Sequence, residues 1–395
     1  LGLGTGAVDA ITTGDYNVGV GDGALTTTTG GDNNTALGVH SLYYNTTGHY
    51  NTATGRAALQ DNTTGSYNTA SGYLALYNNT TGGGNTAVGQ GALHNNTTAS
   101  NNTALGNASL SANTTGTENV ATGKGALQSN TTGSYNHAFG VNAGYAITTG
   151  STNIAIGNAA LSTATTASGN TAVGHSALAA NTSGSSNVGV GLNALTANTT
   201  GSDNTAVGRR ALDSNTTGPW NTAVGEQAGE AVTSGANNLL LGRRSGTSGA
   251  PSGAVTTASH VLCLGDDNIS NFYCADTSIS SSDRRDKADI EDFSAGLDFI
   301  NQMRPVTYRW DKRSWYEDGV PNGSNKKDKL NIGFISQEVQ ELEQALGFST
   351  NKDDELICNT NEDDSAIGLK YERLVPILVN AIKELSAKVE ALENA

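Results

Sequence analysis

A 17-residue repeat fills most of the first 245 residues and restricts the folds open to this chain. Asn recurs at this interval at fourteen positions, from Asn17 to Asn238, and Gly follows each Asn after four residues. The first such pairs are Asn17 and Gly21, Asn34 and Gly38, and Asn51 and Gly55. A unit of this length is too short for a strand-helix-strand crossover and lacks helical periodicity. Each unit is therefore predicted to form one coil of a parallel β-solenoid or β-roll, which makes the chain mainly β.

The consensus unit, N-T-A-V-G-x-x-A-L-x-x-N-T-T-G-x-x, divides into three parts. The NTAVG run alternates and predicts a short strand that ends at a glycine turn. The AL pair predicts a second inward-facing element, and NTTG contains residues that favour turns. The recurring Asn is interpreted as a stacked ladder or turn cap. Glycosylation at sequons such as Asn45-Thr46-Thr47 is the alternative, although an Asn- and Thr-rich repeat produces such sequons by composition alone.

The core of one coil is predicted to be thin, with a Val or Ile, a Leu and several alanines. Burying these groups contributes a few kcal/mol per coil, which is less than the cost of ordering 17 residues. Several chains that share one axis would bury a second face of each coil. The Ala or Ser that always stands seven residues after the Asn fits close packing at such an axis. We therefore expect a homotrimer, with a shaft about 65 Å long at the usual strand spacing.

Composition narrows the function. The chain has 395 residues, 50 of them Gly and only 5 Pro, and charged residues make up 14%. Disordered chains carry more charge and proline, and collagen needs Gly at every third position. A net charge of −15 argues against nucleic-acid binding. No apolar run is long enough to predict a transmembrane helix, so we expect no membrane insertion. No cofactor or metal ion is expected.

Residues 246–281 interrupt the repeat. A Gly- and Ser-rich loop is followed by the runs VLCLG and NFYCA, which predict short strands. These strands either cap the end of the solenoid or form a receptor-binding tip. The candidate tip residues are Asp266, Asp267, Phe272 and Tyr273. Three cysteines are too few for a disulfide framework, and Cys263 and Cys274 either form a pair or are buried thiols.

Residues 282–395 have a different composition, with little Gly and many charged residues. GLDFINQMRP predicts a helix that ends before Pro305, and VTYRW predicts a strand. NIGFISQEVQELEQAL predicts a strand followed by a helix. Residues 371–394 predict a long C-terminal helix, in which Pro376 fits only near the start.

Apolar residues recur along that last helix at alternating intervals of three and four, which is a coiled-coil seam. The seam residues are Val375, Leu378, Ile382, Leu385, Val389 and Leu392. Branched residues at one seam position with Leu at the other favour dimers in simple peptides, so a trimer would require the surrounding domain to impose its symmetry. Packing of the seam on its own domain is the alternative.

Four ordered motifs mark this segment: SDRRDKADI at 282–290, LDFINQMRPVTYRW at 297–310, IGFISQEVQ at 332–340 and YERLVPILVNAIKEL at 371–385. Together they resemble the intramolecular chaperone domain of phage tail spikes, endosialidases and tail fibres. In that family the chaperone trimerises the fibre and then cuts itself off. The resemblance implies cleavage between Ser281 and Ser282, with Ser282 as the nucleophile and Lys287 as its partner. The chain departs from the family at Asp286, where an apolar residue is usual. A serine hydroxyl needs a neighbouring base, and Ser-Lys pairs are known variants of the catalytic triad.

The repeats resemble the head repeats of trimeric autotransporter adhesins, although this unit is longer. Taken together, the two resemblances predict a viral tail fibre located in the virion that binds a host cell-surface glycan or protein. The chain begins inside a repeat-like segment without Met, so we expect preceding residues that connect it to other tail proteins. A bacterial trimeric adhesin and a polysaccharide-degrading tailspike are the alternatives. An adhesin would end in a membrane anchor, and a tailspike enzyme needs paired carboxylates, which the shaft repeat does not provide.

Overall fold

The computed structural model describes residues 1–269, 288, 290–316, 319–360 and 367–394. They form two compact units. The shaft unit comprises Leu1–Ala250 and Ala254–Asp266, and the C-terminal unit comprises Pro251–Gly253 and Asp267–Ala395. The fold class predicted from the sequence, a parallel β-solenoid followed by a small region of strands and helices that ends in a helix, is confirmed.

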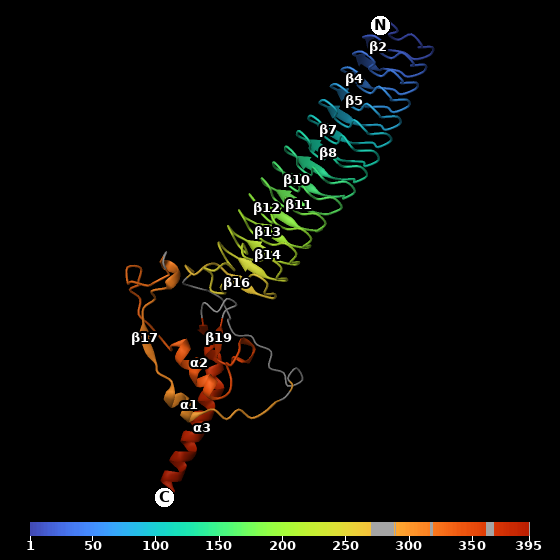
Figure 1. The fold of residues 1–395 in the computed structure, drawn as a ribbon. Coiled ribbons are helices and arrows are strands. Elements are labelled where there is room, and N and C mark those ends of the chain that lie inside the picture. Colours follow the sequence, from blue (N-terminus) through green and yellow to red (C-terminus); the bar gives the residue numbers. More distant parts are fainter. Residues whose placement is uncertain (270–287, 289, 317–318, 361–366, 395) are drawn as a thin grey trace. The chain divides into compact units, whose positions relative to one another are not determined.

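The shaft is a stack of coils, each of which contributes one short strand to a single parallel sheet of sixteen strands (Figure 1). Neighbouring strands in the sheet are neighbours in sequence, so the chain rises one coil at a time. The strands are β1 Gly2–Leu3, β2 Val18–Val20, β3 Thr35–Leu37, β4 Thr52–Thr54, β5 Thr69–Ser71, β6 Thr86–Val88, β7 Thr103–Leu105, β8 Val120–Thr122, β9 His137–Phe139, β10 Ile154–Ile156, β11 Thr171–Val173, β12 Val188–Val190, β13 Thr205–Val207, β14 Thr222–Val224, β15 Leu239–Leu241 and β16 Leu262–Leu264.

The register between coils follows the sequence period. From β1 to β15 each strand residue pairs with the residue 17 positions later, as Ala36 does with Ala53. Backbone bonds join the coils outside the strands as well, and Leu42 N donates to Ala58 O at 3.0 Å. The step from β15 to β16 pairs Leu239 with Leu262, a distance of 23 residues, because the last coil contains an insertion.

The core of each coil is thinner than predicted. We count positions from the repeat Asn as position 0, so that the strand occupies positions 1 to 3. Only the middle strand residue points inward, and it is a fully buried Ala in most coils. The Val at position 3, predicted to lie in the core, lies on the outer face of the sheet, where Val224 is 40% exposed. A strand of three residues can turn only one side chain inward when its middle residue is the buried one.

The Ala or Ser at position 7 also lies inside the coil, beside the Leu at position 8. Ala58 and Leu59, for example, are fully buried within a single chain. The prediction that this small residue packs at an axis shared between chains is therefore wrong, because its own coil encloses it.

The repeat Asn forms a buried ladder, as predicted. Asn51 shows the pattern: its backbone N and its Nδ2 donate to Asn34 Oδ1, at 3.0 and 3.1 Å. Its Nδ2 also donates to Gly65 O, 2.9 Å away. An amide carries both donors and acceptors, so each Asn satisfies buried backbone groups and passes the same pattern to the next coil.

A second ladder runs along the Asn at position 11. Asn62 Nδ2 donates to Asn45 Oδ1 at 2.8 Å and to Gly65 O at 2.9 Å. Asn45, the asparagine of the sequon considered above, is fully buried, so its side chain serves this ladder and is closed to a glycan in the folded shaft.

The second ladder ends where the core is rearranged. In two of the three coils that have Gly in place of Leu at position 8, those of Gly144 and Gly229, an apolar residue also replaces Asn at position 11, at Ile147 and Val232. Both apolar side chains are fully buried. The preceding ladder amides, Asn130 and Asn215, are left with a buried Oδ1 that has no partner among the described residues. The branched side chain at position 11 thus fills the space of the missing Leu and interrupts the ladder.

Left-handed backbone recurs in every coil. The Gly at position 4 has φ near +130°, and a Cβ on Gly38 would lie 2.4 Å from Gly55 O in the next coil. Gly is therefore needed here for its backbone angle and for close packing. The buried Leu at position 8 is also left-handed, with φ of 53° at Leu59. This conformation costs an isolated Leu about 1–3 kcal/mol. Leu59 is held in it by a bond from its N to Ala75 O of the next coil at 3.0 Å and by a bond from Asn62 N to its own O at 3.3 Å.

The C-terminal unit contains the helices and strands that its sequence predicts, together with short elements that it does not. They are α1 Leu297–Gln302, β17 Val306–Tyr308, η2 Arg313–Trp315, β18 Asn331–Gly333, α2 Ser336–Ala345, η3 Lys352–Asp354, β19 Cys358–Thr360, β20 Ile367–Leu369, η4 Tyr371–Arg373 and α3 Leu374–Glu393. β17 pairs with β18 and β19 with β20, both antiparallel. Pro376 stands in the first turn of α3, as expected. The pair β19 and β20 was not predicted.

We predict that the residues at positions 8 and 11 are energetically coupled, so that replacing either one alone destabilises the coil. A Cβ at Gly144 would lie 2.9 Å from Leu127 Cδ2 and 3.1 Å from Ile147 Cδ1, so Gly144→Leu should overpack the core by about 1–3 kcal/mol. Ile147→Asn should cost about 2–4 kcal/mol through lost packing. The double variant restores the consensus coil. Its loss of unfolding free energy should therefore be smaller than the sum of the losses in the two single variants. Thermal unfolding of the four proteins measures the coupling, and additive losses would contradict it.

Candidate functional site

The residues of the predicted cleavage site lie outside the part of the chain that the structure describes. This holds for Ser281, Ser282 and Lys287, and for Asp286. After the cleavage site the described residues are 288 and then 290 onward, so the geometry that follows concerns the body of the C-terminal unit.

A small apolar core holds the C-terminal unit together. Phe299 of α1 and Val339 of α2 pack with Ile357, with Cys358 of β19 and with Ile377 of α3. These residues come from segments far apart in the sequence, so the core forms only when α1, α2, β19 and α3 come together. α3 consequently contributes one of its faces to its own unit.

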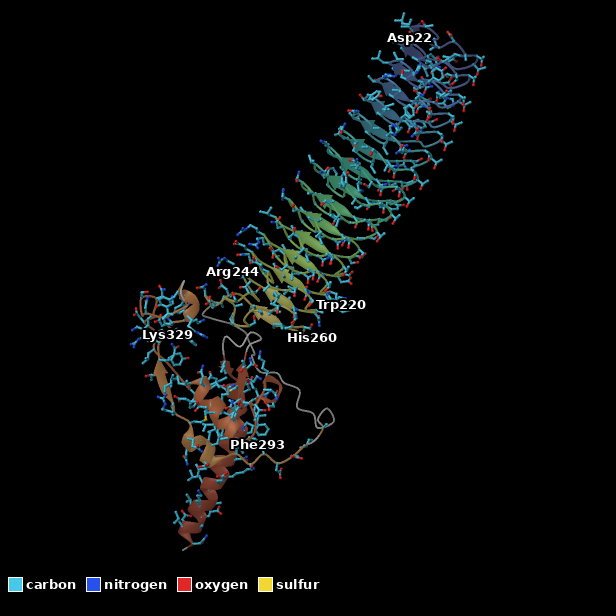
Figure 2. All side chains as sticks on the ribbon, in the orientation of Figure 1. Asp22, Trp220, Arg244, His260, Phe293 and Lys329 are labelled. Carbon is cyan, nitrogen blue, oxygen red and sulfur yellow. The ribbon has the colours of Figure 1, made fainter. Side chains whose placement is uncertain are left out.

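Polar side chains of α3 fix the approach of the chain to α1. Asn380 Nδ2 donates to Phe293 O at 2.7 Å and to Ala295 O at 3.2 Å. Leu297 N donates to Glu384 Oε2 at 3.2 Å, so this carboxylate lies at the N-terminal end of α1. Gly296 is packed so closely that a Cβ there would contact the same carboxylate. Figure 2 shows Phe293 in this unit.

A buried carboxylate connects α2 to β19. Glu343 is almost fully buried and accepts bonds from Ser349 Oγ and from the backbone N of Ile357 and of Cys358. Burial, followed by the neighbouring Glu343, raises the pKa of the Cys358 thiol to about 12. The thiol therefore stays protonated at neutral pH and serves as packing. Sequence analysis missed Glu343, because a Glu in a charged helix carries no signal of burial.

The predicted seam of α3 faces away from this core. Its first and last members, Val375 and Leu392, are 57% and 78% exposed, and the four between them are exposed as well. The residues of α3 that pack inward are instead Leu374, Ile377 and Ala381. Within the described residues, packing of the seam on its own unit is therefore excluded. An apolar stripe of this length on an exposed helix is typical of a surface that binds another helix.

The described candidate tip residues, Asp266 and Asp267, bond to nearby residues of their own units. Asp266 Oδ2 lies 3.2 Å from Arg243 Nη1, and Arg243 Nε lies 3.8 Å from Glu226 Oε2. Within the C-terminal unit, Asp267 O accepts from Lys312 Nζ at 3.0 Å. Phe272, Tyr273 and Cys274 lie outside the described residues, whereas Cys263 is buried with its Sγ 3.6 Å from Gly265 O. Among described residues no group of three or more His, Cys, Asp or Glu is placed to hold a metal ion.

Residues 282–348 match the family model described as the chaperone of endosialidase. The match confirms the family predicted from the motifs, and it spans the first three of them. The matched stretch contains α1, β17, β18 and all of α2, whereas the seam of α3 follows it. Neither the curated proteins nor the solved structures contain a significant match. Across the residues that the structure covers, every helix is too short or too polar to span a bilayer.

We expect the exposed seam to control self-association. Ile382→Glu places a charge on the seam at a side chain that contributes nothing to the core, so the unit should fold while the oligomer dissociates. Ala387→Glu is the matched control, since it adds the same charge to the same helix off the seam. Light scattering after size exclusion measures the mass of each variant, and circular dichroism checks the helix. An unchanged oligomer in the Ile382 variant would show that the seam is not an interface.

Proposed function

We propose that the chain is part of a viral tail fibre whose C-terminal unit is an intramolecular chaperone. The observation that carries the proposal is the order of parts: a solenoid shaft is followed in the same chain by a stretch that matches the chaperone of endosialidase. A shaft of this kind has no catalytic residues at fixed repeat positions. We propose that the shaft is a mechanical element and that its surface binds a receptor on the host cell.

The proposed assembly is a homotrimer. Two exposed apolar surfaces support it. One is the seam of α3, and the other is the outer face of the shaft sheet, where Leu105, Phe139 and Ile156 are each at least 40% exposed. Solvent contact with both surfaces is unfavourable, and association of identical chains would remove it. The virion is the corresponding location, and other tail proteins are the proposed partners at the N-terminal end.

We further propose that the chaperone is released by self-cleavage between Ser281 and Ser282. The Ser282 hydroxyl would add to the carbonyl carbon of Ser281, with Lys287 taking the proton. Breaking the C–N bond leaves the acyl group of Ser281 as an ester on Ser282 Oγ and frees the Ser282 amine. Water then hydrolyses the ester and regenerates the hydroxyl. A lysine acts as a base near neutral pH only when its surroundings lower its pKa.

Intact mass spectrometry after expression tests the cleavage. Wild type should yield two fragments that correspond to residues 1–281 and 282–395, and Ser282→Ala should remain at full length. Ser280→Ala is the matched control, since it removes a neighbouring serine hydroxyl, and it should be cut like wild type. Uncut wild type, or a cut Ser282→Ala variant, would refute the proposed chemistry. The oligomeric mass of uncut Ser282→Ala separately tests the chaperone role.

A further inference from the structure

One recess on the shaft differs from every equivalent place in the repeat. Position 6 of a coil is occupied by Gly at Gly23, Gly91 and Gly125, each with a left-handed backbone. At Gly23 the space beside the missing side chain is filled by His40 and Tyr43 of the next coil, which a Cβ would approach to 2.7 and 3.1 Å.

The same filling occurs at Gly125, where the next coil supplies Asn142 and Tyr145. At Gly91 a Cβ would have no neighbour within 4 Å. The reason is visible in the sequence, because the next coil places Ala108 and Ser111 at the positions where the other two coils place larger side chains. The recess at Gly91 is therefore open.

This open recess has the size and the lining of a small-molecule site. Its volume is about 380 Å³, within the range of about 300–1,000 Å³ that is usual for ligand pockets. It is lined by Leu74, Gln90, Gly91, His94, Asn95, Asn107, Ala108 and Ser111. The lining has apolar groups at Leu74 and Ala108 and contains no Asp, Glu, Lys or Arg.

The polar groups around the recess are held in place by their neighbours. Asn107 Nδ2 donates to Gln90 Oε1 at 3.3 Å. Among the described residues nothing else bonds to the two amide groups, so Gln90 Nε2 remains a donor and Asn107 Oδ1 an acceptor. The His94 ring stacks on Tyr77 with centroids 5.3 Å apart, and Asn95 Oδ1 accepts from Asn78 Nδ2 at 3.0 Å.

We propose that the recess at Gly91 binds a short neutral saccharide. Sugar hydroxyls both donate and accept, as the amides of Gln90, Asn95 and Asn107 do. The C–H face of a sugar ring suits the apolar surface of Leu74 and the ring of His94, which its stacking on Tyr77 holds in place. No Lys or Arg lines the recess, so nothing there would pair with the carboxylate or sulfate of a charged glycan, and this favours a neutral ligand. The proposal rests on the proposed role of the shaft in binding the host surface and assigns that role a ligand class and a place.

The position of the recess is compatible with the proposed trimer. Its residues follow the turns at Gly72, Gly89 and Gly106, so they lie beyond the strands β5, β6 and β7. Association through the outer face of the sheet does not use them.

The most informative variant fills the recess and keeps the side-chain amides that are proposed to bind the ligand. Ala108→Asn with Ser111→Tyr installs the two residues that cover Gly125, and Asn142 has the same left-handed backbone as Ala108, with φ of 56° and 55°. The shaft already accommodates this arrangement. Asn107→Ala is a milder variant at an exposed side chain, and Asn158→Ala, at the same repeat position three coils later, is its matched control.

Wild type is screened on an array of neutral oligosaccharides built from hexoses and N-acetylhexosamines, with sialylated and sulfated glycans on the same array. The strongest neutral glycan is then titrated into each variant by calorimetry. We expect the filled variant to lose binding at least tenfold, Asn107→Ala to lose about three- to tenfold in line with one hydrogen bond, and Asn158→Ala to bind like wild type.

Three outcomes would overturn the proposal: binding to no neutral glycan, equal binding by the filled variant, or equal loss in Asn158→Ala. The oligomeric mass and the cleavage of the filled variant are measured alongside. A failure of glycan binding with normal assembly and cleavage refutes the saccharide site alone, whereas failure of assembly and cleavage in wild type refutes the proposed function.

Discussion

The shaft depends on one constraint, namely that each residue lies on the residue 17 positions later. Most interior side chains therefore contact the same residue type in the coils above and below, so the interior favours residues that pack or bond well against copies of themselves. Asn does so because its amide donates in one direction and accepts in the other. A column of Asp would bring like charges together. Gly at position 4 suits the stack because its neighbour is another Gly, and no side chain fits between them.

The same constraint decides what the sequence reveals. The period predicts the coil, the Asn spacing predicts the ladder, and the Gly at position 4 predicts the turn, because each depends on contact with an identical neighbour. The direction of individual side chains is harder to predict. An alternating run such as Thr222-Ala223-Val224 has two possible orientations, and a sequence reader assigns the larger Val to the core. The structure buries Ala223 instead, since Leu212 and Leu240 of the neighbouring coils already fill the space inside.

The left-handed Leu at position 8 and the burial of Glu343 were beyond prediction for another reason. Both are imposed by contacts that lie outside the local sequence: bonds between coils for Leu59, and the meeting of α2 with β19 for Glu343. The seam of α3 was predictable because its spacing is local, whereas its exposure depends on Asn380 and Glu384, which bind the chain more than eighty residues earlier. Family resemblance, rather than residue chemistry, accounts for the assignment of Ser282 and Lys287.

A regular shaft creates a difficulty for assembly. Because coils are alike, sliding one chain against another by 17 residues would recreate nearly the same contacts, so the shaft specifies its alignment weakly. The exchanges at Gly144 with Ile147 and at Gly229 with Val232 are buried within single chains and offer an outside partner little to recognise. A terminal unit with its own core and an exposed seam gives the chains one place at which to align. This is the physical reason for a repetitive fibre to carry a chaperone at its end.

In a regular shaft, the repeat positions that maintain the fold differ from the positions that are available to bind a ligand. Positions 0, 2, 4, 7 and 8 are buried or left-handed in nearly every coil and have little freedom to vary. Positions 5 and 9 are at least partly exposed in nearly every coil and change from coil to coil, from Arg56 and Tyr73 to Gln90 and Asn107 at position 5. A change there alters the surface without disturbing the ladders or the core. A recess such as that at Gly91 can therefore arise and be reshaped while the fold stays the same, so a solenoid can present a changing surface on an invariant core.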